Sequence, residues 1–143
     1  MSQIGFDFEN HHFCGEVPES LDKPMTLTLQ VTRKCNLHCI YCSEEKQLDE
    51  PGREELSDII NKIRNVKRII VSGGEPLLRP DIFDILKELR NQRNIIALAT
   101  NCTKVDKEYA TKLVGLIDYA DVTIDGPRNI HNTIRGGYDD IIK

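Results

Sequence analysis

This chain of 143 residues alternates short strand-like segments with longer segments of helical periodicity, and that alternation leaves few folds open to it. The expected strands are Thr26–Thr32, Arg68–Ser72, Ile95–Thr100 and Ala120–Asp125. Apolar residues recur at helical spacing in three groups between and after them, which are Leu56, Ile59, Ile60 and Ile63, then Ile82, Ile85, Leu86 and Leu89, and then Tyr109, Leu113, Val114 and Ile117. The alternation predicts an α/β fold of parallel βα units with right-handed crossovers.

Polar residues inside the expected strands indicate that one face of the sheet is wet. In the first and fourth strands one face carries Leu27, Leu29, Val31, Val122 and Ile124, and the other carries Thr28, Gln30, Thr32, Asp121, Thr123 and Asp125. Parallel strands buried on both faces usually form continuous apolar runs instead. We therefore predict a curved sheet with helices outside, that is, a partial (β/α) barrel. Ligands of such sheets collect at the carboxyl ends of the strands.

The composition fits one globular domain. Hydrophobic residues make up 39% of the chain and charged residues 29%, which provides enough apolar content for a packed core. We predict an N-terminal arm or leading element at residues 1–24 and the core at residues 25–143. Within the arm, His11, His12 and Cys14 are interpreted as part of an exposed polar run rather than as metal ligands.

Charge and hydropathy argue against several function classes. The net charge is −4 and Lys and Arg form no stripe, so nucleic acid is not an expected partner. No apolar run is long enough to span a membrane, and no secretory signal is visible, so a cytoplasmic location is expected. The five cysteines indicate metal ligands or free thiols rather than a disulfide framework.

The last residues, Gly136–Lys143, predict the first turn of a further helix with Asp139 as its cap. A βα unit of a barrel averages about 31 residues, so four units fill the chain. Four units do not close a barrel. We therefore expect a fragment, or a protein that completes its sheet with a partner chain, because an uncovered sheet edge invites aggregation.

Cys35, Cys39 and Cys42 directly follow the first expected strand. Three thiolates are one fewer than the four that usually hold a [4Fe–4S] cluster, which would leave one iron for another ligand. Two other interpretations stay open from the spacing alone. The residues share one face of a helix, where cysteine packs as a small hydrophobe, or they bind zinc with a fourth ligand. The neighbouring cations Arg33 and Lys34 would lower the thiol pKa.

A second cluster, formed by Gly73, Gly74, Glu75 and Pro76, ends the second expected strand. Paired glycines let the backbone approach a ligand closely, and Glu75 adds a carboxylate at the strand end. If the first two strands are neighbours, this turn lies beside the cysteine loop. This turn alone is weak evidence for a ligand site. Its position about thirty residues downstream of the three cysteines makes it strong evidence.

These residues together resemble the radical S-adenosylmethionine (radical SAM) enzymes. The matching motifs are Cys35-x3-Cys39-x-Tyr41-Cys42, Gly73-Gly74-Glu75-Pro76, Thr100-Asn101, Val122–Pro127 and Ile130–Gly136. The last two are most similar to the branch that carries SPASM or related C-terminal cluster domains, which includes peptide and cofactor maturases. The resemblance covers about residues 26–143 and implies a partial barrel of the radical SAM type, with about four of the usual six βα units.

The resemblance also implies the cofactors and the reaction. A [4Fe–4S] cluster would be held by Cys35, Cys39 and Cys42, and S-adenosylmethionine (SAM) would complete the open iron. In the family, the reduced cluster cleaves SAM to a 5′-deoxyadenosyl radical that abstracts hydrogen from the substrate. The implied partners are an external one-electron donor such as flavodoxin or ferredoxin and an unknown substrate, such as a peptide or a cofactor precursor.

Several SAM contacts follow from the same resemblance. Glu75 and the backbone beside it hold the methionine ammonium, which is a charge-assisted contact. Thr123 matches a position that often carries a ribose-contacting hydroxyl. Thr100 and Asn101 would line the same cavity.

Four further residues have two interpretations each. Tyr41 lies near adenine or packs within the loop. Arg135 meets the SAM carboxylate or is a solvated arginine. Asp125 contacts SAM or substrate, or caps the following turn. Cys102 stands where relatives usually have glycine after Thr-Asn, and is a substrate-side thiol or a harmless replacement.

Two alternatives to this function remain. One is a small glycyl-radical activase, whose cysteine loop and fourth strand resemble this sequence less well. The other is a truncated, non-catalytic module that binds a cluster or SAM without turnover.

Overall fold

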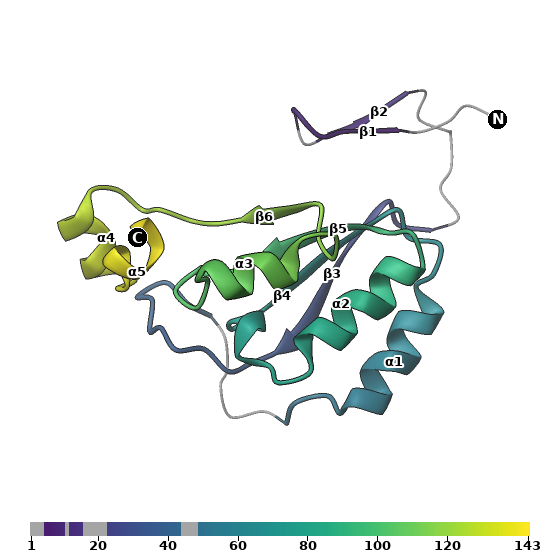
Figure 1. Cartoon of the computed structure of the whole chain (residues 1–143), viewed down its shortest axis with the longest axis horizontal. Coiled ribbons are helices and arrows are strands. Elements are labelled where there is room, and N and C mark those ends of the chain that lie inside the picture. Colours follow the sequence, from purple (N-terminus) through teal and green to yellow (C-terminus); the bar gives the residue numbers. More distant parts are fainter. Residues whose placement is uncertain (1–4, 11, 16–22, 44–48) are drawn as a thin grey trace.

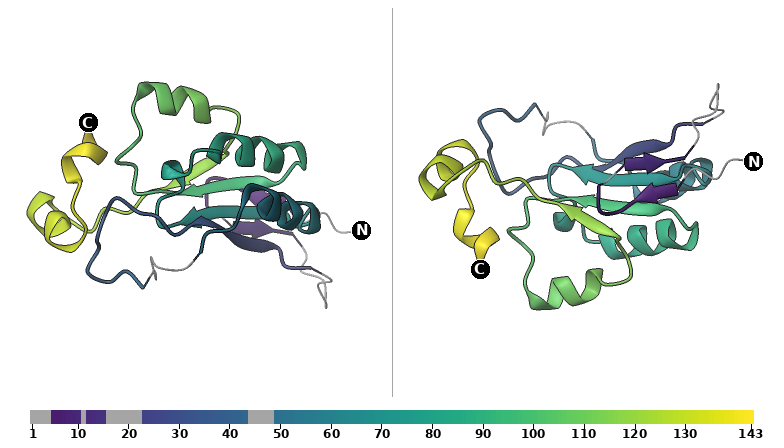
Figure 2. Two further views of the ribbon diagram at one scale, coloured as in Figure 1. Left: turned by 90° about the horizontal axis from the view of Figure 1, so that it is seen from below. Right: turned by 90° about the horizontal axis from the view of Figure 1, so that it is seen from above.

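A four-stranded parallel sheet forms the body of the computed structural model, which describes residues 5–10, 12–15, 23–43 and 49–143. Its order is β3-β4-β5-β6, with the strands Thr26–Thr32, Arg68–Gly73, Ile95–Ala99 and Tyr119–Asp121. Helices α1 (Arg53–Lys62), α2 (Ile82–Asn91) and α3 (Lys107–Leu113) lie along one face of it (Figures 1 and 2). The predicted α/β fold of parallel βα units is confirmed.

The helices cover this face because apolar residues of both layers meet there. The fully buried side chains from strands and helices are Val31, Leu56, Ile60, Ile69, Val71, Ile82, Ile85, Leu86, Leu89, Ile96 and Leu98. Burying one such side chain stabilises the fold by about 1.5–3 kcal/mol. Most of the apolar residues whose helical spacing predicted α1 and α2 are therefore the residues that those helices bury in the core.

The opposite face of the sheet is polar on β3 and at the carboxyl ends of the strands, as the alternation predicts, and carries Ile70 and Ala97 on the central strands. Gln30 pairs in register with Ser72, and Ala99 pairs with Asp121, on the face away from the helices. A hairpin of β1 (Gly5–Asp7) and β2 (His12–Cys14) lies over this face at the amino-terminal ends of the strands (Figure 1).

The hairpin is fixed by aromatic contacts. The Phe6 ring stacks on Tyr119 with centroids 6.2 Å apart, and the Arg68 guanidinium lies 5.2 Å from the Phe6 centroid. Part of the predicted N-terminal arm is thus a hairpin. Cys14 is exposed in it, and His11 lies outside the described residues.

Two predicted bounds are wrong on the β6 side. The strand expected to reach Asp125 ends at Asp121, because the last residue of β5, Ala99, pairs there and offers no partner beyond it. The helix expected to include Val114 ends at Leu113. Val114 is 80% exposed there.

Two short helices, α4 (Arg128–Ile134) and α5 (Tyr138–Ile142), lie beyond the carboxyl ends of the strands (Figure 1). The expected cap at Asp139 is wrong, because Gly137 in the left-handed conformation precedes α5. Asp139 instead pairs with Arg128 at 2.6 Å. Among the described residues, no helix is both long and apolar enough to cross a membrane.

Candidate functional site

A cavity of about 260 Å³ lies at the carboxyl ends of the strands, on the polar side of the sheet. Most of the predicted site residues line it, namely Cys35, Cys39, Tyr41, Cys42, Gly73, Gly74, Thr100, Asn101, Thr123 and Arg135. Sequence reasoning missed four others, which are Leu37, Ser72, Ala99 and Asp121. Ser72, Ala99 and Asp121 lie on the predicted polar face near the strand ends, so the alternation contained the signal for them.

The three cysteines of the first motif line this cavity together as free thiols. Partial burial raises the pKa of the Cys39 thiol, and Cys35 and Cys42 raise it further, while Arg135 opposes them. The thiols are therefore close enough to repel one another as thiolates. A bound cation would relieve that repulsion.

The loop geometry excludes one of the three interpretations of the cysteines. No helix forms over residues 33–43, so the helix-face interpretation is wrong. The zinc and cluster interpretations both stay predictions at this point. In a cubane each thiolate binds a different iron, so thiols spread around one cavity fit the cluster.

Hydrogen bonds to sulfur also suit a cluster ligand. The Leu37 N–H lies 3.4 Å from Cys35 Sγ, and Asn101 Nδ2 lies 3.8 Å from the same sulfur. Donors aimed at a ligand atom orient it and tune the metal. Asn101 thus touches the cysteine motif, which explains why the sequence carries it at the end of β5.

Glu75 is fully buried, and its carboxylate joins two strand ends. Oε1 accepts hydrogen bonds from the Thr100 hydroxyl at 2.7 Å and the Leu77 N–H at 3.0 Å, and Oε2 accepts one from the Asn101 N–H at 2.7 Å. Glu75 is not among the residues that line the cavity, and neither is Pro76, which is buried behind it. These hydrogen bonds let the carboxylate stabilise the wall from behind, and the ammonium contact expected from the resemblance stays a prediction.

A polar chain connects this carboxylate to the cysteine loop. Asn101 Nδ2 donates to Asn36 Oδ1 at 3.0 Å, and Asn36 Nδ2 donates to the Thr103 hydroxyl at 2.8 Å. The Thr103 hydroxyl donates in turn to Asn101 Oδ1 at 2.8 Å. Sequence reasoning missed Asn36 and Thr103, because the contacts of Asn36 with Thr103 and Asn101 span more than sixty positions in the chain.

The paired glycines serve a close approach between two backbones. A Cβ atom at Gly73 would overlap the carbonyl oxygen of Thr32, and one at Gly74 would overlap that of Lys34. Gly73 also has φ +152°, which disfavours other residues. The glycines therefore bring the end of β4 against the start of the cysteine loop while their other side lines the cavity.

The end of α4 contacts the cysteine loop through a side-chain hydrogen bond and a backbone hydrogen bond. Arg135 Nε lies 2.9 Å from Asp125 Oδ2, and the Arg135 guanidinium also contacts the Tyr41 hydroxyl. The Ile40 N–H donates to the Ile134 carbonyl at 2.9 Å. Asp125 does not line the cavity, so its observed role is to orient Arg135, which does.

His131, which is fully buried, fixes the turn on either side of α4. Its Nδ1 accepts the Asp125 N–H at 3.2 Å, and its Nε2 lies 3.1 Å from the Gly136 carbonyl. A neutral ring with the proton on Nε2 satisfies both contacts. The sequence motif around His131 is thus explained by chain geometry.

Cys102 lies outside the cavity wall. Its backbone is left-handed with φ +62°, a conformation that glycine adopts at no steric cost. Burial raises the pKa of its thiol, and Glu75 adds to that effect. The placement favours a replacement over a substrate-side thiol.

The sequence pattern of the Radical SAM superfamily matches residues 29–143. The chain belongs to this superfamily. Its family is characterised by a [4Fe–4S] cluster and SAM, in agreement with the predicted cofactors, and family members with enzyme names support an enzyme.

Similar proteins include two biosynthetic enzymes. The chain is 37% identical over 123 residues to pre-heme d1 synthase of Dinoroseobacter shibae, covering 80% of this chain and 30% of that protein. It is 32% identical over 124 residues to the mycofactocin maturase MftC of Mycobacterium tuberculosis, covering 81% of this chain and 32% of that protein. The chain thus spans about a third of the length of these relatives.

Solved structures share the fold. SuiB of Streptococcus suis bound to precursor peptide SuiA superposes with a TM-score of 0.72 at 19% identity, covering 85% of this chain and 29% of that one. Native anSMEcpe with bound AdoMet gives a TM-score of 0.68 at 22% identity, covering 83% and 39%. These likenesses support a sheet of the radical SAM type.

Proposed function

We propose that this chain holds a [4Fe–4S] cluster through Cys35, Cys39 and Cys42 and binds SAM in the adjoining cavity. When bound, the cluster supplies the electron that cleaves SAM to the 5′-deoxyadenosyl radical for hydrogen abstraction. The observation that carries the proposal is the convergence of the three free thiols with Gly73 and Gly74 on one cavity. Family membership supports it independently.

The residues of the chain have distinct roles in this proposal. The backbone of Gly73 and Gly74 meets the methionine ammonium, while buried Glu75 holds that turn in place. The Thr123 hydroxyl lines the cavity and would contact the ribose. Arg135, oriented by Asp125, supplies a planar donor for the SAM carboxylate.

Tyr41, Thr100 and Asn101 complete the wall. Tyr41 is 55% exposed and lines the cavity, which suits contact with adenine. Thr100 and Asn101 are nearly buried and hold the turn of Glu75, so they shape the wall from behind. Thr100 and Asn101 would thereby exclude water from this side of the cavity.

The wider context of the reaction is also part of the proposal. We propose a peptide or a cofactor precursor as substrate, supported by similarity to a maturase and to a structure that holds a precursor peptide. The electron would come from an external donor such as flavodoxin or ferredoxin in the cytoplasm. Among the described residues β6 pairs only with β5, which supports extension of the sheet by further residues or a partner chain.

Anaerobic reconstitution with iron and sulfide tests the site. We expect a cluster whose EPR spectrum changes when SAM is added, and 5′-deoxyadenosine after reduction with dithionite. Cys39→Ala should abolish the cluster. Cys102→Ala is the matched control, because burial raises the pKa of both thiols and only Cys39 lines the cavity.

Three results would count against the proposal. A complete cluster in Cys39→Ala would refute the ligand assignment. An EPR spectrum unchanged by SAM would refute the proposal that one iron of the cluster lacks a protein ligand and binds SAM. A SAM-responsive cluster that never yields 5′-deoxyadenosine would favour the non-catalytic binding module.

A further inference from the structure

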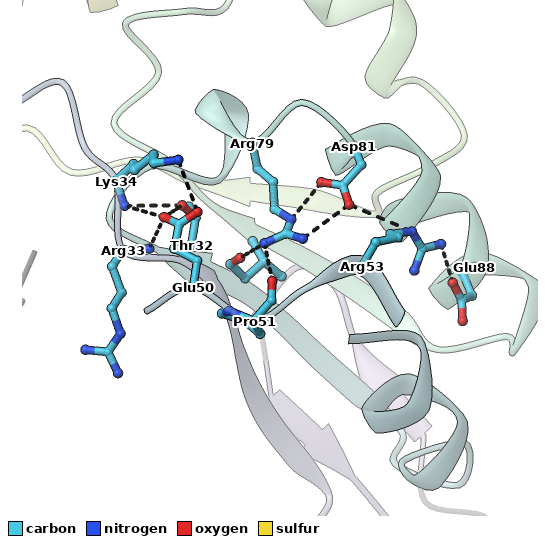
Figure 3. Close-up of polar contacts among 10 residues, drawn as sticks. Thr32, Arg33, Lys34, Glu50, Pro51, Arg53, Arg79, Asp81 and Glu88 are labelled. Carbon is cyan, nitrogen blue, oxygen red and sulfur yellow. Dashed lines mark hydrogen bonds and ion pairs between the residues drawn. The ribbon is translucent and has the colours of Figure 1, made fainter. Parts of the chain in front are cut away.

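A compact polar cluster lies at the base of the cysteine loop, outside the cavity (Figure 3). The chain leaves β3 at Thr32 and comes back beside it at Glu50, just before α1. Glu50 and Arg79 contact the chain at this crossing, and neither of them lines the cavity. The cluster therefore acts on the loop and not on a ligand.

Glu50 holds the three residues that precede Cys35. Its Oε1 accepts the Thr32 hydroxyl at 2.6 Å, the Arg33 N–H at 3.1 Å and the Lys34 N–H at 3.2 Å. Its Oε2 lies 3.5 Å from Lys34 Nζ. The hydrogen bond from Thr32 holds the pKa of the Glu50 carboxyl below its ordinary value, so the group is ionised at neutral pH.

Arg79, which is only 8% exposed, also holds the two segments together at the base of the cysteine loop. Its Nη1 donates to the Val31 carbonyl at 2.7 Å and to the Pro51 carbonyl at 3.0 Å, so one nitrogen joins the outgoing and returning chains. Asp81 fixes the guanidinium with contacts at 2.7 and 3.2 Å (Figure 3). This bidentate ion pair fixes the guanidinium, and the guanidinium in turn restricts the positions of the outgoing and returning segments.

The stretch held by Glu50 also contacts the glycine turn. The Thr32 carbonyl accepts the Gly74 N–H at 2.9 Å, and the Lys34 carbonyl accepts the Glu75 N–H at 2.8 Å. The peptides before Cys35 are thus bonded to Glu50 through their N–H groups and to the glycine turn through their carbonyl groups. Their orientation sets where Cys35 enters the cavity.

We propose that Glu50 is a positioning residue for the cluster, which fixes the chain direction at Cys35 and its spacing from the glycine turn. The inference rests on the proposed function. Without the carboxylate, the Arg33 N–H loses its acceptor and the Lys34 N–H keeps only the Thr32 hydroxyl at 3.2 Å. The peptides before Cys35 are then held mainly by the bonds of their carbonyl groups to the glycine turn. The cluster would then be bound by a less ordered ligand.

Glu88 provides a closely matched control. Its side chain is 23% exposed against 24% for Glu50, and its Oε1 accepts the Ser57 hydroxyl at 2.6 Å. Its Oε2 pairs with Arg53, and the contacts join α1 to α2 (Figure 3). Glu88 therefore resembles Glu50 in burial and bonding, but it has no contact with the residues before Cys35.

The test compares Glu50→Ala, Glu88→Ala and Glu50→Gln after anaerobic reconstitution. Under air we expect cluster absorbance to decay about tenfold faster in Glu50→Ala than in wild type, the order of effect known for groups that orient metal ligands. The EPR change on adding SAM should also be altered in Glu50→Ala. Glu88→Ala should match wild type in both readouts. Glu50→Gln should recover most of the loss, because its amide oxygen still accepts from the three donors.

The outcomes separate this inference from the proposed function. Equal decay in Glu50→Ala and Glu88→Ala would overturn the positioning role. A wild-type chain that assembles no cluster would overturn the proposed function instead. If Glu50→Ala does not fold by circular dichroism, Thr32→Val takes its place. That variant removes, at similar volume, the hydroxyl that donates to Glu50 and accepts the Lys34 N–H. It should speed decay about threefold, and wild-type decay in it would overturn the inference.

Discussion

The cavity has two walls that are built differently. On the side of β4 and β5, Glu75, Thr100 and Asn101 are at most 8% exposed, and their polar groups bond to one another. On the side of β6, Asp121 and Thr123 are exposed, and α4 reaches the cysteine loop through Arg135, which contacts Tyr41, and through one backbone hydrogen bond. The interior wall is fixed by the core beneath it, whereas the edge wall depends on these few contacts.

The largest difference between the walls should appear in the loss of stability caused by Glu75→Gln in the interior wall. The amide keeps the size of the carboxylate, but its NH2 group meets the Asn101 N–H, and a charged acceptor is lost from a buried site. We expect the free energy of unfolding in urea to fall by about 3 kcal/mol. Asp121→Asn at the edge is the control and should change it by less than about 0.5 kcal/mol. Similar losses in both variants would mean that the walls are equally fixed.

A smaller effect is expected on Asp125→Asn, which removes the charge that orients Arg135. The contact of α4 with the loop should weaken, and hydrogen exchange of the Ile40 N–H, which bonds to Ile134, should rise up to about fivefold. Amides of β4 should be unchanged. Asp84→Asn breaks the more exposed pair with Lys87, far from the cysteine loop, and should leave Ile40 unaffected.

Acid should reproduce this loosening in the wild-type chain. The hydrogen bond from Arg135 lowers the pKa of the Asp125 carboxyl from its ordinary value of 3.8. A lowered folded-state pKa means that the stabilisation is present above 3.8 and is lost as pH falls through the folded value. Exchange of the Ile40 N–H, corrected for its intrinsic pH dependence, should therefore rise only below about pH 4. A rise at neutral pH would implicate another group.

The smallest effect is expected on Cys102→Gly, which lies behind the interior wall. Glycine relieves the left-handed backbone at φ +62° but adds freedom to the unfolded chain. The two effects nearly offset, so we expect stabilisation of about 0.5 kcal/mol in urea unfolding. A clear destabilisation would show that the thiol contributes packing that outweighs the strain.

The contrast between the walls also explains what the sequence could predict. The bounds of β3 agree with prediction because its alternation reflects a real difference between a face covered by helices and an exposed polar face. The predicted end of β6 is wrong because Val122 and Ile124, 39% and 49% exposed, meet no such cover. A pattern of side chains predicts a strand only where neighbouring strands provide the hydrogen bonds.

The site follows the same rule. Its motif residues could be found because cysteine and paired glycine are chemically distinctive. Asn36 and Glu50 could not, since their partners, Thr103 and Thr32, are set by tertiary structure at separations of 67 and 18 positions. Ordinary polar residues acquire a role only when the fold brings their partners together.

The glycine pair has a mechanical consequence. Gly73 and Gly74 press their backbone against that of Thr32 and Lys34 with no side chain between them. No side chain lies there that could change its rotamer, so a shift of the segment that carries the thiols moves the turn that lines the cavity by a similar amount. The two segments behave as one stiff part, and a substitution as small as alanine would work as a wedge between them.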